Sequence, residues 1–173
     1  MYAERQPPDA KTQVSVHGSP GIVSFATCGE GPIRAAHVMG SLLYVVSGPW
    51  LYSVTNAAIP VVTRLGGQIS GSGVLSIEDN GSQLATVNGA NGYIYSTVAG
   101  FQIITDSAFN AANSVTFMNQ FFLFDHVGTG EFFRSDLLDG TAYDSTAFAT
   151  AESRSDNTQS VFNLKDVLYV WGV

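Results

Sequence analysis

The sequence has little charge, and this shortage excludes one large class of function. Only 12% of its 173 residues are charged, about half the usual share, and the formal net charge is −7. With two lysines in the whole chain, no face can carry the dense positive patch that gripping a phosphate backbone requires. Direct electrostatic binding of DNA is therefore not expected.

Cysteine is also scarce. The single Cys28 excludes an intramolecular disulfide framework and a cysteine-rich zinc site. It lies in the Gly-rich stretch ATCGEGP, where we expect a small, buried or half-buried side chain and no reactive thiol. The first residues, MYAERQPPDAK, lack the apolar core of a signal peptide, and no run of eighteen apolar residues occurs. The sequence predicts neither a membrane span nor a secretion signal.

Short runs of alternating β-forming residues, separated by Gly, Asn or Asp, fill the chain from residue 33 onward. The string VSGPWLYSVT at residues 46–55 is echoed by VNGANGYIYST at residues 87–97. First strands of successive units are expected near Ile33, Val74, Ser114 and Ser160, at intervals of 41, 40 and 46 residues. A period of about 40 to 50 residues with four antiparallel strands is typical of a β-propeller blade. Each repeated string is then the middle hairpin of one blade.

We therefore predict an all-β fold: about three and a half four-stranded antiparallel blades of a longer β-propeller ring. Residues 1–32 are expected to form an N-terminal extended segment and first turn, and residues 33–173 the partial propeller. Its blades are placed near residues 33–73, 74–113, 114–159 and 160–173. Because a sheet with two apolar faces cannot cover both alone, neighbouring blades must stack. The expected core is Leu43, Val45, Tyr52, Val54, Val74, Ile77, Leu84, Tyr93, Tyr95, Val115, Phe117, Phe122, Phe124, Phe132, Leu168 and Val170.

The sequence predicts no catalytic, cofactor-binding or metal-ligating residue. His17, His37 and His126 fall in unrelated contexts without paired spacing, and no G-x-S-x-G elbow precedes a helix. The string RLGGQISGSG, residues 64–73, lacks the Gly-Lys-Ser/Thr ending of a phosphate-binding loop. We interpret it as a linker between two blades.

The acidic residues give no metal or catalytic pattern either. Asp136, Asp139 and Asp144 are not spaced like the ligands of a calcium loop, and we interpret them as residues that cap their own backbone in a solvated turn. Glu78 and Asp79 are adjacent, so their side chains are expected to diverge at a strand end. They should not form a catalytic carboxylate pair.

Two features are candidates for contacts with other molecules. Trp50 follows a proline in a hairpin turn and is the aromatic residue that we expect to be exposed, while most other aromatic side chains should be core. Residues 139–157 depart furthest from the blade pattern. We interpret them as a contact loop whose deletion should leave the propeller folded.

Several distinctive strings, VNGANGYIY and SDLLDGTAYD above all, resemble the packaged DNA stabilisation proteins of short-tailed bacteriophages. These are tail accessory factors, also called tail hub or nozzle proteins, and the likeness to their N-terminal portion covers essentially the whole chain. The resemblance implies a β-propeller that assembles as a ring, expected to be a hexamer, below the portal and its adaptor protein. A tail needle or a tail fibre or spike protein would be a further partner.

On this resemblance the protein is a structural part of the virion tail, made in the bacterial host cytoplasm, and not an enzyme. It would help to close the DNA channel and retain the packaged genome, which passes through without sequence-specific binding. No cofactor and no membrane is implied. Low charge density suits such a wall, because DNA must slide past it without sticking.

Two other classes of propeller stay open at this point. A carbohydrate-binding or glycan-processing propeller would need inward-pointing carboxylates about 5 to 10 Å apart, and only one expected inner strand carries acids. A WD40-like or kelch-like scaffold would show a recurring Trp-Asp or Gly-Gly pair, which these units lack. Both are therefore less favoured than the phage structural protein.

Overall fold

The protein is described by a computed structural model over residues 2–5, 14–17, 21, 23–29, 31–151 and 156–172. Every regular element in these ranges is a β-strand, and no helix there is long and apolar enough to cross a membrane. Near the N-terminus, β1 (Tyr2–Arg5) and β2 (Val14–His17) pair in an antiparallel ladder.

The other strands form three complete blades and two strands of a fourth. The first blade contains β3 (Ile33–Met39), β4 (Leu42–Ser47), β5 (Trp50–Thr55) and β6 (Val62–Gly67). The second contains β7 (Ser76–Asp79), β8 (Gln83–Val87), β9 (Gly92–Ser96) and β10 (Gly100–Ile103). The third contains β11 (Val115–Met118), β12 (Phe121–Asp125), β13 (Glu131–Asp136) and β14 (Asp139–Thr150). A final pair consists of β15 (Thr158–Leu164) and β16 (Val167–Gly172).

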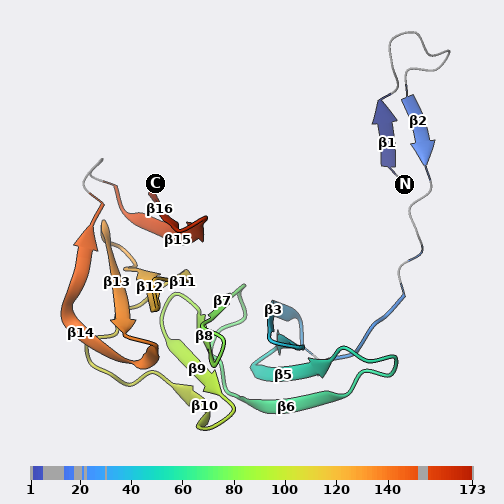
Figure 1. Ribbon diagram of the computed structural model, residues 1–173, viewed down its shortest axis with the longest axis horizontal. Coiled ribbons are helices and arrows are strands. Elements are labelled where there is room, and N and C mark those ends of the chain that lie inside the picture. Colours follow the sequence, from blue (N-terminus) through green and yellow to red (C-terminus); the bar gives the residue numbers. More distant parts are fainter. Residues whose placement is uncertain are drawn as a thin grey trace.

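All neighbouring strands within a sheet are antiparallel and follow chain order, as expected for propeller blades. The blades stand in an open arc, with the first strand of each blade on the inner side and the last complete-blade strands β6, β10 and β14 on the outer side (Figure 1). Inner strands of successive blades contact one another, β3 with β7, β7 with β11, and β11 with β15. The predicted all-β, partial β-propeller fold is confirmed.

Tight turns join the second and third strands of each blade. Gly48, Gly89 and Gly128 lie in these turns with φ values of 54°, 86° and 80°. This left-handed region is open to glycine at little cost, because glycine has no Cβ. The repeated Gly-containing strings therefore form hairpin turns, as the sequence indicated.

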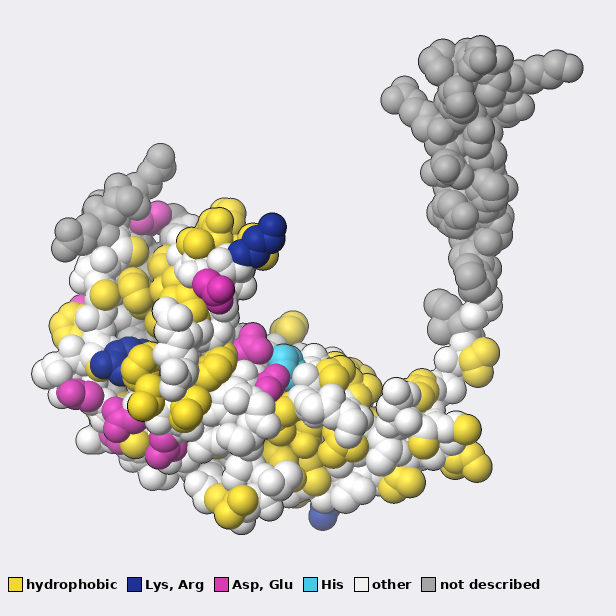
Figure 2. All heavy atoms as spheres, viewed as in Figure 1, with side chains coloured by type: hydrophobic (Ala, Val, Ile, Leu, Met, Phe, Trp, Pro, Cys, Tyr) yellow, Lys and Arg dark blue, Asp and Glu magenta, His cyan; other side chains and the backbone are white. Residues whose placement is uncertain are grey.

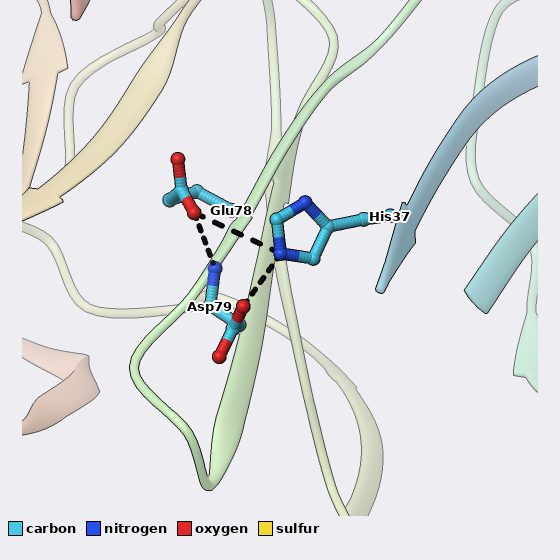
Figure 3. A group of neighbouring side chains, drawn as sticks. All are labelled: His37, Glu78 and Asp79. Carbon is cyan, nitrogen blue, oxygen red and sulfur yellow. Dashed lines mark hydrogen bonds and ion pairs between the residues drawn. The ribbon is translucent and has the colours of Figure 1, made fainter. Parts of the chain in front are cut away.

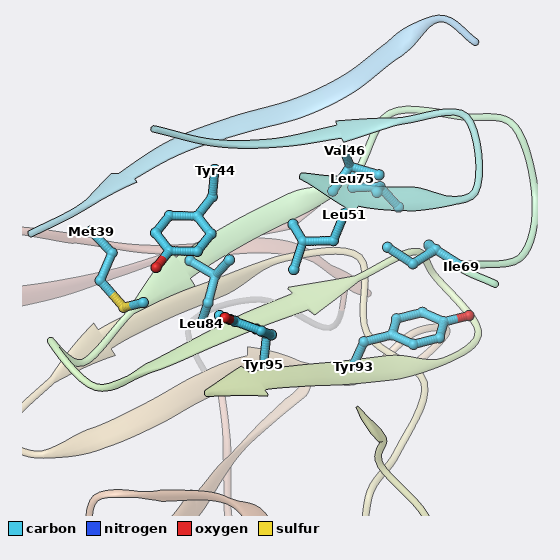
Figure 4. Close-up of a cluster of buried hydrophobic side chains, with 9 residues drawn as sticks. All are labelled: Met39, Tyr44, Val46, Leu51, Ile69, Leu75, Leu84, Tyr93 and Tyr95. Atoms are coloured by element: carbon cyan, nitrogen blue, oxygen red, sulfur yellow. The ribbon is translucent and has the colours of Figure 1, made fainter. Parts of the chain in front are cut away.

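Apolar side chains fill the seams between blades. Between the first two blades, buried residues of β4 and β5 face those of β8 and β9 (Figure 4). This cluster comprises Met39, Tyr44, Val46, Leu51, Ile69, Leu75, Leu84, Tyr93 and Tyr95. The other face of β4 carries Val45, which packs with Cys28 and Val54. The central strand is thus apolar on both faces, and burying one large side chain stabilises the fold by about 1.5–3 kcal/mol.

An aromatic cluster fills the second seam. Phe122, Phe124 and Phe133 pack there with Tyr143 and with Val87 of the second blade. Phe124 and Phe133 are direct partners across β12 and β13, and their rings stack at a centroid distance of 5.2 Å. Such pairs contribute about 0.5–1.5 kcal/mol beyond their buried area.

Side-chain hydroxyls also join the inner strands of different blades. Ser76 Oγ accepts a hydrogen bond from the backbone N–H of Val115 at 3.0 Å. One blade later, Ser114 Oγ accepts from the Val161 N–H at 2.8 Å, and Thr116 Oγ1 accepts from the Asn163 N–H at 3.0 Å. In this way, backbone N–H groups of the inner strands that point away from their own sheet find hydrogen-bond acceptors.

One member of the predicted core is misplaced by one residue. Val74 is 88% exposed, and Leu75 is buried in its place, where the Leu75 N–H donates to the Arg34 carbonyl before β7 begins. The other predicted core residues of the strands are buried or half-buried.

The interpretation of residues 139–157 as a loop is wrong for its first part. Residues 139–150 form β14, the outer strand of the third blade, and Tyr143 on this strand is buried. The ladder with β13 pairs Ser135 with Tyr143 and Phe133 with Phe148, so β14 carries a bulge between these pairs. Deleting the whole segment would remove core side chains. Residues 152–155 lie outside the described part of the chain.

Candidate functional site

The most polar cluster on the inner strands lies where the first two blades meet. His37 comes from β3, and Glu78 and Asp79 come from β7, with all three side chains turned toward one another (Figure 3). His37 Nε2 lies 2.5 Å from Asp79 Oδ2 and 3.7 Å from Glu78 Oε1. The space-filling view shows a histidine beside acidic side chains on the concave side of the arc (Figure 2).

Local structure aims both carboxylates at the histidine. Asp79 ends β7, and its Oδ1 accepts a hydrogen bond from the Gly81 N–H of the following turn at 2.6 Å, which leaves Oδ2 for His37. Glu78 folds back so that its Oε1 accepts from the Asp79 N–H at 3.2 Å. Burial raises the pKa of Glu78 above its usual value, and that hydrogen bond and His37 only partly oppose the rise.

Two expectations from the sequence are corrected here. Glu78 and Asp79 do not diverge, because the turn after β7 and the fold-back of Glu78 bring one oxygen of each to the same imidazole. His37 is not isolated, because its partners lie 41 and 42 residues later, one blade period along the chain. The sequence signal that could have found the cluster is this period, since equivalent inner strands lie side by side.

His126 does not join this cluster. His126 Nδ1 lies 3.0 Å from Glu131 Oε2, a pair across the hairpin between β12 and β13. The backbone of His17 lies in β2, and its side chain is outside the described residues. Cys28 is buried, as expected, and burial raises the pKa of its thiol, so it is poorly suited as a nucleophile.

Two of the three acidic residues, Asp139 and Asp144, cap their own backbone as predicted. Asp139 Oδ1 accepts hydrogen bonds from the N–H and the hydroxyl of Thr141, and Asp144 Oδ1 does the same with Thr146. Although burial opposes the shift, hydrogen bonds from Thr141 and Gln83 lower the pKa of Asp139. Asp136, Asp139 and Asp144 do not converge with another possible ligand among the described residues.

Arg34 is a buried cation that holds the linker after the first blade. The residue is 4% exposed, and its guanidinium donates to four backbone carbonyls at 2.7 to 3.2 Å. These are the carbonyls of Gly48, Ile69, Ser70 and Gly73. The linker predicted at residues 64–73 starts later than expected, because β6 continues to Gly67.

The exposed tryptophan is not the one that we expected. Trp50 is half-buried, and the guanidinium of Arg64 lies over its ring, 4.4 Å from the centroid. Trp171 on β16 is 57% exposed and stacks with Phe162, whose ring also stacks on Tyr169 at 5.1 Å. An exposed apolar face of this kind is typical of surfaces that bind another protein surface.

The chemistry available on the inner strands is narrow. Arg34 is the only Lys or Arg on the described inner strands β3, β7, β11 and β15, and its charge is buried. Glycoside hydrolysis needs two carboxylates facing a bound sugar from separate sides, about 5 to 10 Å apart. Glu78 and Asp79 do not lie on separate sides, because they are neighbours on β7 and both present an oxygen to the same imidazole.

The fold defines a class: a β-propeller scaffold whose blades pack against one another through apolar seams. The computationally designed Ika4 protein has a similar solved structure, with a TM-score of 0.54 at 12% identity over 84% of this chain and 94% of that one. A family model described as Bacteriophage P22 Gp10, β-propeller, matches residues 4–173, so the chain belongs to this family of phage DNA stabilisation proteins.

A search of curated proteins gave no match. Family membership confirms the resemblance to packaged DNA stabilisation proteins seen in the sequence. It also gives the chain a structural role in a phage particle.

Proposed function

We propose that this chain forms part of the tail hub, or nozzle, of a short-tailed phage. Copies of the protein form a ring, a hexamer, below the portal and its adaptor, and this ring extends the DNA channel. A tail needle or a tail fibre or spike protein binds further out and closes the exit, so that the packaged genome is retained. The family match over residues 4–173 is the observation that carries the proposal.

The inner strands support this role through what they offer to DNA. A wall that DNA slides past must not hold phosphates, and phosphate binding depends on exposed Lys and Arg. Arg34 is the one Lys or Arg on the described inner strands, but it is buried and its guanidinium donates to backbone carbonyls. The chain also carries a formal net charge of −7, which repels a polyanion.

Filled seams supply the rigidity that such a ring needs. The two apolar clusters between the three complete blades contain fully buried side chains such as Phe122, Phe124 and Leu84. Densely packed interiors transmit load with little compression. The exposed face of β15 and β16, with Phe162, Tyr169 and Trp171, is the surface on which we expect further β-structure of the ring to pack.

The alternative, a carbohydrate-binding or glycan-processing propeller, has less support. The two acids of the described inner strands, Glu78 and Asp79, are neighbours on β7 and are both directed at His37. The sugar-stacking surface of such a propeller would have to be the aromatic face of β15 and β16. That face corresponds in the fold to the side of the first blade that the second blade covers.

The deciding experiment joins assembly with genome retention. The full protein is mixed with its portal and adaptor and analysed by native mass spectrometry, and tail-less DNA-filled particles are treated with nuclease with and without it. We expect a ring of about six copies on the adaptor and protection of the DNA. A protein that ignores the adaptor, leaves the DNA sensitive and binds glycans on an array would overturn the proposal in favour of the alternative.

A further inference from the structure

We propose that His37, Glu78 and Asp79 form a binding site for a divalent transition metal at the inner seam between the first two blades. Zinc is the ion for which the geometry is considered and with which the site is tested. The ligand types are suitable, because imidazole nitrogen and carboxylate oxygen are common ligands of zinc. This inference concerns stability of the seam and is independent of the tail hub proposal.

The geometry needs little adjustment to accept an ion. In a tetrahedral site with zinc bonds of about 2.0–2.2 Å, ligand atoms lie roughly 3.3–3.5 Å apart. His37 Nε2 is 2.5 Å from Asp79 Oδ2 and 3.7 Å from Glu78 Oε1, so the two distances bracket this value. All three ligand atoms lie within 4.8 Å of one another. An ion placed among them replaces the direct hydrogen bond by three metal bonds.

The charge of this cluster and its exposure to solvent also favour metal binding. Two carboxylates beside one imidazole give a net negative site, and a divalent cation relieves the repulsion between them. The three side chains are 20% to 33% exposed, so an ion can enter from the concave side. That exposure leaves room for water as a fourth ligand. Because the ligands come from β3 and β7, the metal joins two blades that the chain connects only through a linker.

The test is a titration of the purified chain with Zn²⁺, followed by calorimetry and by the thermal unfolding midpoint, and with Co²⁺, followed by its visible absorption. We expect one ion per chain, a midpoint that rises with metal concentration, and an intense tetrahedral Co²⁺ band. Glu78→Gln keeps the pair of His37 with Asp79 but should weaken metal binding by about tenfold or more, since even outer-shell losses cost that much.

Controls separate a metal site from a structural ion pair. His37→Gln should abolish the binding, because the imidazole Nε2 is the nitrogen ligand of the site. The matched control is His126→Gln, because His126 pairs with only one carboxylate, that of Glu131, and its loss should change nothing. Wild-type protein without saturable binding at millimolar metal, or binding that survives both His37→Gln and Glu78→Gln, overturns the proposal.

Discussion

Arg34 places a charge in a buried position where the next blade, 41 residues later, has Leu75. A buried guanidinium costs free energy to desolvate unless its donors are satisfied. Here the carbonyls of the linker and of the hairpin between β4 and β5 accept its hydrogen bonds. One side chain therefore fixes the path of the chain from the first blade to the second.

Replacing Arg34 by leucine tests this role. Arg34→Leu removes the shared donor and leaves carbonyls without a partner, so we expect the free energy of unfolding to fall by at least about 2 kcal/mol. Arg64→Leu is the control, because Arg64 only lies over the ring of Trp50 and should cost less than about 1 kcal/mol. Urea unfolding followed by fluorescence gives both values. Equal losses would show that Arg34 acts only through general packing.

At the scale of the element, β14 is the longest of the described strands. Its twelve residues hold a bulge between Tyr143 and Phe148, opposite Arg134 on β13. The bulge borders a groove of about 320 Å³ that is lined in part by Leu123, Phe132 and residues 146–149. Bulges in edge strands bend the strand and limit unwanted pairing with another sheet.

Shortening this bulge should leave the blade folded. Removing residues 145–147 restores a regular ladder, with Asp144 opposite Arg134 as a pair of opposite charges. We expect an unchanged circular dichroism spectrum and a melting temperature at or above that of the wild type. Removing residues 139–150 as the control should unfold the blade, because the buried Tyr143 is lost. A shortened protein that melts far below the wild type would show that the bulge is required for the fold.

At the scale of the whole molecule, the described strands β15 and β16 carry an exposed aromatic face. Tyr169 is 41% exposed and Trp171 is 57% exposed, on the side of β15 and β16 away from the third blade. Contiguous exposed apolar surface promotes association. The isolated chain should therefore self-associate through this face.

Sedimentation velocity over a range of concentrations checks this expectation. The double variant Tyr169→Ser and Trp171→Ser should lower the average mass toward that of the monomer. Phe148→Ser is the control, because Phe148 is similarly exposed on β14 but lies outside the aromatic stack, and it should sediment like the wild type. Association that is equal in all three proteins would place the contact elsewhere.

The blades could be predicted from the sequence because their strands and their turns are both determined by residues close together in the chain. Alternating apolar residues specify strands, and Gly-containing turns such as that of Gly48 specify hairpins. The slip from Val74 to Leu75 was not predictable, because an apolar pair gives no sign of which residue faces the core. Asp125 was also hidden: it is the fifth residue of β12, where β4 and β8 have valines, and it is fully buried.

The candidate site could not be predicted because it depends on how two blades are placed side by side. His37 and Asp79 are separated by 42 residues and belong to different sheets. Periodicity shows that such residues lie on equivalent strands, but the rotation between blades decides whether their side chains meet. The repeat pattern therefore predicts the strands of each blade, but it does not predict which side chains meet between two blades.

The hydroxyl groups that join inner strands have a consequence for how the molecule opens. Amides inside a blade are held by ladders, so they exchange with deuterium only when the sheet itself unfolds. The amides of Val115, Val161 and Asn163 are held instead by single side chains from the preceding blade. Exchange of these three amides should therefore follow the separation of neighbouring inner strands, and exchange of ladder amides should follow the unfolding of a sheet. Because the seams are filled with apolar side chains, we expect the three amides to be protected as long as the blades stay packed.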